Sequence, residues 1–251
     1  MALERDVVDM KFYPYCLVGQ PVELSELLRG VDGREILQRA VGTLTAVLSE
    51  WDDKKVDLTR ENVLRHDAVV RQVLEEVTPL PFRFGHLVTP DQLASYVDSK
   101  SETLQSKLQH LHNCVEMSVK IIWNREIDLA GPPPEAQPIQ NAGKGAAFLM
   151  SKRAEIQAEA SNSTEVAAIA NWLKSETAGL VRDELVVLRP AEKLVVSASF
   201  LVDRSVLLAY KKRTALFEKE RSDLHFLTSG PWPPYSFSNN DLEFKTHLGV
   251  S

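Results

Sequence analysis

Hydrophobic and polar residues alternate over several short stretches of the chain, which is the pattern of half-buried β-strands. The clearest stretch is CVEMSVKIIW, residues 114–123, in which every second residue from Val115 to Trp123 is apolar and the residues between them are mostly polar. Further strands are predicted at 10–18, 35–41, 44–50 and 80–88. These stretches predict a sheet in the first half of the chain.

A period of 3.6 residues replaces the alternation at 61–77 and predicts an amphipathic helix. Its apolar stripe consists of Val63, His66, Val70, Val73, Leu74 and Val77. A second helix is predicted to begin at TPDQ, residues 89–92. Thr89 can cap it, Pro90 suits the first helical position, and Gln92 completes a capping box. The buried stripe expected for this helix is Leu93, Val97, Leu104, Leu108 and Leu111.

The second half of the chain is predicted to contain two helices followed by strands at 184–189 and 193–202. A helix capped by Asp203 is then expected to run to about residue 221, and a last strand covers 224–228. This order is most of a ferredoxin-like βαββαβ unit without its opening strand. The predicted class is therefore α+β, with a C-terminal domain that is a modified ferredoxin-like fold with extra N-terminal helices.

A proline-rich stretch divides the two halves. The segment LAGPPPEAQPIQNAGKG, residues 129–145, contains four prolines, which lack backbone donors and favour extended polyproline structure. We therefore expect an N-terminal α+β domain at 1–128, a linker at 129–145 and a C-terminal domain at 146–251.

Composition narrows the class of protein. The chain has 251 residues and a net charge of -6, which argues against a nucleic-acid partner. The longest nearly apolar run, 194–202, is far shorter than the ~20 residues of a membrane span, and no signal peptide is predicted. Cys16 and Cys114 form no CxxC motif, so free thiols and a cytoplasmic location are expected.

The candidates for chemistry are weak. His110, His112 and Cys114 alternate as metal ligands could, but they fall at a polar helix-to-strand junction. His66 lies on an apolar stripe and is interpreted as a structural histidine. The GKG at 143–145 lacks the spacing of a phosphate-binding loop. No catalytic, cofactor-binding or metal site is predicted, and no enzyme activity.

Two aromatic motifs remain. SGPWPPYSF, residues 229–237, contains a P-x-x-P pattern that a peptide-binding domain could read, but it directly continues a strand. We therefore interpret it as a rigid aromatic clamp against the C-terminal domain, with a turn near Gly230. In the predicted strand LPFRFGHLV, residues 80–88, Phe82 and Phe84 lie on one face and Arg83 lies on the other. The predicted structural or partner-contact residues are Phe82, Phe84, Pro231, Trp232, Pro233, Pro234 and Tyr235.

These two motifs, in this order and at this separation, resemble the GvpL/GvpF family of gas vesicle proteins. The start of the chain, KFYPYCLVGQP, is similar to the family's opening strand, although Cys16 stands where glycine is commoner. The resemblance covers most of the chain. It implies two α+β domains, the C-terminal one ferredoxin-like, and brings no catalytic residues.

The resemblance also implies a function. Proteins of this family are accessory or minor structural components of gas vesicles and are thought to bind the small, very hydrophobic major shell protein during assembly. We therefore expect the shell protein and other gas vesicle accessory proteins as partners, and a cytoplasmic location at the gas vesicle. The alternatives are a cytoplasmic ligand-binding regulatory protein with a ferredoxin-like domain, and an enzyme whose residues are dispersed along the chain.

Overall fold

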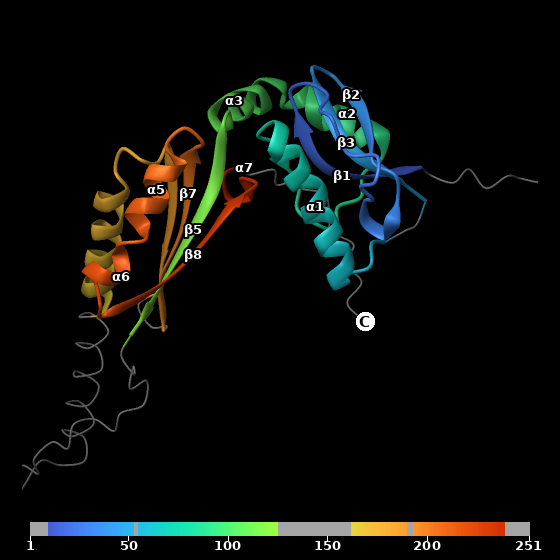
Figure 1. Cartoon of the computed structure of the whole chain (residues 1–251). Helices are drawn as coiled ribbons and strands as arrows, with labels where there is room; N and C mark the ends of the chain where they lie inside the picture. Colours follow the sequence, from blue (N-terminus) through green and yellow to red (C-terminus); the bar gives the residue numbers. More distant parts are fainter. Residues whose placement is uncertain (1–9, 53–54, 125–161, 190–192, 239–251) are drawn as a thin grey trace, which may run out of the picture. The chain divides into compact units, whose positions relative to one another are not determined.

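The structure is a computed structural model that describes residues 10–52, 55–124, 162–189 and 193–238 (Figure 1). It contains two compact units. The first comprises the chain up to Glu116 together with the segment from Pro231, and the second runs from Met117 to Gly230. The fold is α+β, with two antiparallel sheets. No helix among the described residues is long and apolar enough to cross a membrane.

The first unit is built on a four-stranded sheet in the order β2-β3-β1-β4. Its strands are β1 (Lys11–Val18), β2 (Leu37–Val41), β3 (Leu44–Trp51) and β4 (Leu80–Pro81). β1 pairs antiparallel with β3 from Lys11↔Trp51 to Val18↔Thr45, with a bulge between Pro14 and Cys16. The prediction of a strand over 80–88 was too long, because β4 ends at Pro81.

Helices complete the first unit: α1 (Arg60–Glu76), α2 (Pro90–Ser99), α3 (Ser101–Leu111) and the short α7 (Tyr235–Ser238), with a 3-10 turn η1 (Val31–Gly33). The capping box predicted at Thr89 is present, with Gln92 as its partner. The helix predicted to follow it is broken at Lys100, which separates α2 from α3.

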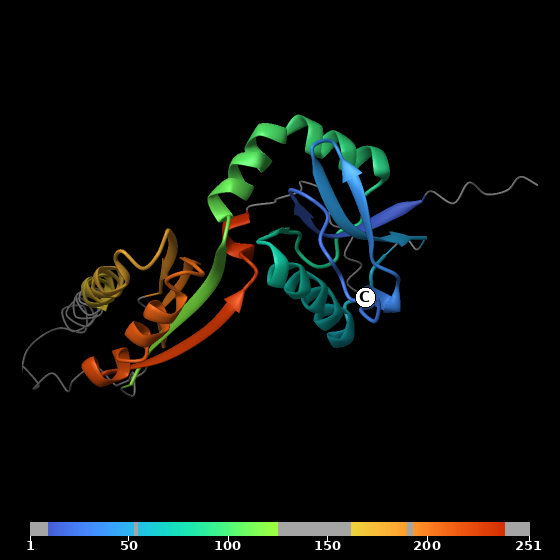
Figure 2. The same cartoon turned by 45° about the horizontal axis from the view of Figure 1, so that its top comes forward.

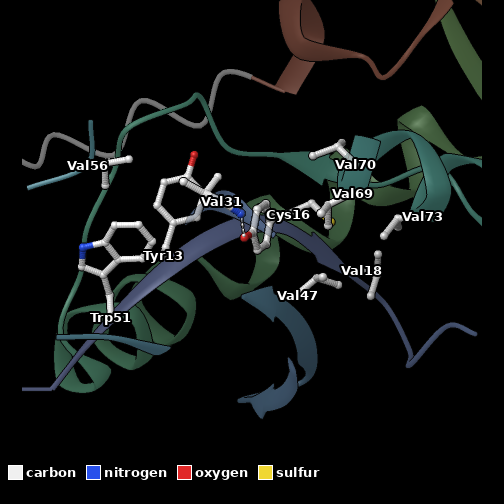
Figure 3. Close-up of a cluster of buried hydrophobic side chains, with 11 residues drawn as sticks. Tyr13, Cys16, Val18, Val31, Val47, Trp51, Val56, Val69, Val70 and Val73 are labelled. Atoms are coloured by element: carbon white, nitrogen blue, oxygen red, sulfur yellow. Dashed lines mark hydrogen bonds between the residues drawn. The ribbon is translucent and has the colours of Figure 1, made fainter. Parts of the chain in front are cut away.

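The core of the first unit lies between β1 and α1. Val69, Val70 and Val73 of α1 pack with Tyr13 and Cys16 of β1 in one buried cluster (Figure 3). The predicted apolar stripe of α1 is correct for His66, Val70, Val73 and Leu74, which are buried. Val63 was wrongly placed on that stripe, because its side chain is exposed.

The second unit contains a sheet in the order β6-β7-β5-β8. Its strands are β5 (Cys114–Trp123), β6 (Asp183–Leu188), β7 (Leu194–Asp203) and β8 (Leu224–Trp232). A helix over 162–177, α5 (Leu207–Thr214) and α6 (Phe217–Glu220) lie on one face of this sheet (Figures 1 and 2).

Three sequence predictions for this region need correction. β5 was expected as the last strand of the first domain, but it pairs within the second sheet. The single helix expected from Asp203 to 221 is two helices, and Val206, rather than Asp203, is the N-cap residue of α5. The last strand does not end at Thr228 but continues to Trp232.

The predicted linker at 129–145 lies outside the described residues.

Candidate functional site

A buried histidine organises the first unit. His66 of α1 receives a hydrogen bond on Nδ1 from the Tyr13 hydroxyl at 2.8 Å, and its Nε2 lies 3.1 Å from the Phe82 carbonyl oxygen. A carbonyl can only accept, so Nε2 carries the proton and Nδ1 is the acceptor. The Gly85 amide in turn donates to the Tyr13 hydroxyl at 3.3 Å. These bonds tie α1 and β1 to the loop after β4.

The electrostatics of this histidine fit a structural role. Burial lowers the pKa of His66 to about 4, which outweighs the hydrogen bond to the Phe82 carbonyl. Burial also raises the pKa of the Tyr13 hydroxyl well above its ordinary value. Both groups are therefore neutral near pH 7, and the interpretation of His66 as a structural residue agrees with its contacts.

The two phenylalanines of LPFRFG take different positions. Phe82 is fully buried, and its ring centroid lies 6.4 Å from that of Tyr96 in α2. Phe84 is half-buried and meets the rings of Tyr13 and His66 edge-on, at 6.1 and 5.9 Å. Because the strand has already ended, these side chains do not share one strand face as predicted.

The aromatic motif near the C-terminus also packs on α1. Strand β8 continues through Pro231, and Gly230 lies inside it with a φ of 120°, a conformation that favours glycine. Trp232 is half-buried with the Arg71 guanidinium 4.1 Å from its ring centroid. The prediction of a turn at Gly230 and a clamp on the C-terminal domain was therefore wrong, since Trp232 packs on the first unit.

The residues after Trp232 complete this docking. Pro233 and Pro234 are buried, whereas Pro231 is exposed. The Tyr235 ring stacks at a tilt on His66, with centroids 6.4 Å apart. Burial, followed by the nearby Asp67 carboxylate, raises the pKa of the Tyr235 hydroxyl. Tyr235 thus reaches the same histidine as Phe84, so the two motifs meet at His66.

Helix α7 is held by polar contacts as well. The Glu116 carboxylate accepts hydrogen bonds from the Ser236 amide at 2.9 Å and from the Ser236 hydroxyl at 2.6 Å. Lys107 of α3 donates to the Ser238 carbonyl oxygen at 2.9 Å. Glu116 belongs to the polar side of the alternating stretch, yet it is buried, because α7 covers it.

The remaining candidates for a metal or catalytic site are the region of His110, His112 and Cys114, the two cysteines and the GKG segment. Within the described ranges, no group of three or more His, Cys, Asp or Glu side chains is placed to hold a metal ion, which includes the region of His110, His112 and Cys114. Cys16 and Cys114 are both buried and form no disulfide. Burial raises the pKa of the Cys16 thiol, so this thiol is not activated as a nucleophile. The GKG at 143–145 lies outside the described residues.

Phe84 and Tyr235 pack on His66, and this arrangement is here called the aromatic junction. A profile of the family described as gas vesicle synthesis protein GvpL/GvpF matches residues 11–239. The chain belongs to the GvpL/GvpF family. This membership gives it a role in gas vesicles, and the matched range includes both motifs that meet at His66.

Individual relatives agree with this assignment to the GvpL/GvpF family. The chain is 27% identical over 230 residues to gas vesicle protein F1 of Halobacterium salinarum, with 90% of this chain and 91% of that protein covered. It is 24% identical over 167 residues to gas vesicle protein F of Nostoc sp., with 65% of this chain and 64% of that protein covered.

Solved structures share the fold. The crystal structure of GvpF from Anabaena sp. PCC7120 matches with a TM-score of 0.73 at 20% identity, covering 91% of this chain and 96% of that one. GvpF from Microcystis aeruginosa matches with a TM-score of 0.74 at 16% identity, covering 91% and 98%.

Sequence reasoning found the aromatic residues but missed the residues that receive them. Arg71 and Glu116 were not singled out, because each fits a solvated polar face equally well. One signal was available for His66: a histidine on an otherwise apolar helix stripe needs buried hydrogen-bond partners. Tyr13, in the tyrosine-rich stretch KFYPYCLV, was a plausible partner.

Proposed function

We propose that this chain supports gas vesicle assembly by binding the hydrophobic major shell protein. Membership of the GvpL/GvpF family supports a role in gas vesicles. Other gas vesicle accessory proteins are proposed as further partners, with the chain located at the vesicle. In this account the aromatic junction is structural, and binding takes place on exposed apolar side chains of the first unit.

The observation that carries this proposal is a set of exposed apolar side chains at the start of α1. Leu58, Val63 and Leu64, here called the Leu58 patch, are 73%, 40% and 56% exposed. They follow one another closely in the sequence, in the segment before α1 and in its first turns. We propose that these side chains form one binding surface, because contiguous exposed apolar groups mark interaction sites and an aggregation-prone apolar partner has the matching chemistry.

The seven predicted motif residues are proposed to act through α1. The two motifs that pack around this helix contain all seven of them: Phe82, Phe84, Pro231, Trp232, Pro233, Pro234 and Tyr235. Holding α1 fixed presents the Leu58 patch in one geometry and lowers the entropy cost of binding. The motif residues are therefore positioning residues rather than contacts to the partner.

We also propose that the second unit is a ferredoxin-like domain. Its described elements run β5, helix 162–177, β6, β7, α5, α6 and β8, which is the βαββαβ order with the second helix in two parts. β5 supplies the opening strand that the sequence analysis did not find in the second half. The sheet order β6-β7-β5-β8 places the first and third strands of this unit side by side at the centre, which supports the assignment.

The Leu58 patch is tested by a double substitution. Leu58→Ser with Leu64→Ser is expected to abolish protection of refolding shell protein from aggregation, measured by light scattering. The free energy of unfolding should stay within about 0.5 kcal/mol of the wild type, because both side chains are exposed. Leu27→Ser, at another highly exposed leucine of the first unit, is the matched control and should protect normally. Full protection by the double variant would exclude this patch as the binding surface.

A further inference from the structure

Strand β6 forms an edge of the second sheet, because within the described part of the chain it pairs only with β7. Leu185 and Val187 are 46% and 51% exposed. On the opposite side of the same strand, the Glu184 carboxylate forms an ion pair with Lys174 of the helix at 162–177. Leu185 and Val187 therefore lie on the face of the sheet away from its helices, since successive side chains of a strand alternate.

Alternate residues of β6 direct their backbone N–H and C=O groups toward the open edge of the sheet. The Arg189 amide, just after the strand, donates to the Val195 carbonyl oxygen at 2.8 Å, so it points toward β7. Hydrogen-bond direction alternates along an antiparallel ladder, and the register of β6 with β7 is regular from Asp183 to Leu188. The Arg182 amide, just before this ladder, also points to β7 and donates to the Leu201 carbonyl oxygen at 2.7 Å. Glu184, Val186 and Leu188 therefore direct their N–H and C=O groups toward the open edge, where another strand could pair with them.

The charges around this edge are self-complementary. In RDELVVLR, residues 182–189, Asp183 and Arg189 lie at opposite ends of the same exposed face. If a second copy pairs antiparallel with Val186 opposite Val186, each Asp183 comes opposite an Arg189 and each Leu185 opposite a Val187. A shift of the register by two residues in either direction removes the opposition of Asp183 and Arg189.

We propose that two copies of this chain associate through β6, antiparallel and centred on Val186. The contact is isologous, so both ends carry the same Asp183–Arg189 pair. A strand pair of this length is small beside the ~1,200–2,000 Å² of a stable interface, so the dimer is weak and forms in the micromolar range. It leaves the Leu58 patch of the first unit to the shell protein and is independent of that proposal.

Charge reversal tests both the edge and its register. Asp183→Arg places two arginines opposite each other at both ends, and Arg189→Asp does the same with two aspartates. Each single variant is expected to weaken self-association about tenfold or more, because like charges directly opposite repel. An equimolar mixture of the two variants pairs Arg with Asp at both ends, so it should dimerise like the wild type.

Sedimentation velocity from about 1 to about 100 µM, the range where a weak dimer dissociates, measures these states. Restored association in the mixture, with both single variants folded by circular dichroism, supports the proposal. A wild type that stays monomeric throughout, or a mixture that associates no better than the single variants, overturns it. If Asp183→Arg instead weakens only the protection of shell protein, the edge serves that partner and the proposal is equally overturned.

A second variant covers the case in which a charge reversal disturbs folding. Val186→Pro removes the central outward N–H, and proline is tolerated on an edge strand when its missing donor faces outward. This variant should be a monomer with the β6–β7 pairing retained. Wild-type association by a folded Val186→Pro variant would contradict pairing through the β6 backbone.

Discussion

The rings of Tyr235 and His66 lie 6.4 Å apart between centroids, with an angle of 32° between their planes. Tyr235 comes from the end of the described chain, and His66 from the middle of the first long helix. The contact explains why a proline-rich, aromatic segment follows the last strand. It holds that segment on α1, where the rings of Tyr13, Tyr15 and Phe84 also lie against His66.

Acid is expected to destabilise the first unit through His66. Its pKa is about 4 in the folded protein and near 6.5 when unfolded, so the unfolded state binds more protons between these values. The stabilisation is complete above about pH 6.5 and is lost as the pH falls toward about 4, a difference of about 3 kcal/mol. Urea unfolding across this range measures it. The non-titrating variant His66→Gln should have a flatter profile, and equal slopes would refute the assignment.

Removing the hydroxyl of Tyr13 should be costly. Tyr13→Phe leaves the buried Nδ1 of His66 without its donor, which is expected to cost about 1–3 kcal/mol in the free energy of unfolding. Tyr210→Phe is a matched control, because the buried Tyr210 hydroxyl has no hydrogen-bond partner among the described residues. That control should be neutral or stabilising. Equal losses in both variants would show that the His66 hydrogen bond contributes nothing specific.

Trp232 and Arg71 should be energetically coupled. Trp232→Ala is expected to destabilise the protein by about 2 kcal/mol, less than a fully buried tryptophan, because its side chain is half-buried. A double-mutant cycle with Arg71→Ala should give a coupling energy of about 0.5–1 kcal/mol from the cation–π contact. Denaturant midpoints of the four proteins supply the cycle. Strictly additive losses would mean that the contact seen between Arg71 and the Trp232 ring does not stabilise the fold.

Glu116 should hold α7 in place. Glu116→Gln weakens both hydrogen bonds from Ser236 by removing the charged acceptor, whereas Ser236→Ala removes only the hydroxyl bond. Limited proteolysis within 231–238 should therefore accelerate in both variants, and more strongly in Glu116→Gln. If cleavage of this segment is unchanged in Glu116→Gln, the carboxylate is not its anchor.

The local signals of the fold could be predicted from the sequence. The capping box at Thr89, the buried stripe around Val70 and the alternation around Val119 each depend on neighbours a few residues apart. The sheet that a strand joins could not be predicted in the same way. β5 has the same alternating pattern in either sheet, and its pairing with β7 and β8 depends on contacts with distant parts of the chain.

The candidate site could likewise be predicted only in part. The aromatic residues were identifiable because prolines and large rings rarely gather in a solvated loop. Their target was not, because Arg71 and Glu116 become special only when Trp232 and Ser236 reach them. The motif at 229–237 was assigned to the wrong unit for this reason. The strand before it belongs to the second sheet, whereas Trp232 and Tyr235 contact α1 of the first unit.

The most direct test of the account is whether the wild-type chain protects the shell protein from aggregation. Purified shell protein would be refolded by dilution from denaturant without ATP, and light scattering followed with and without this chain in several-fold excess. We expect a strong, dose-dependent suppression that an equal amount of an unrelated acidic protein does not produce. Scattering that is unchanged at the highest excess would contradict the claim that this chain binds the shell protein.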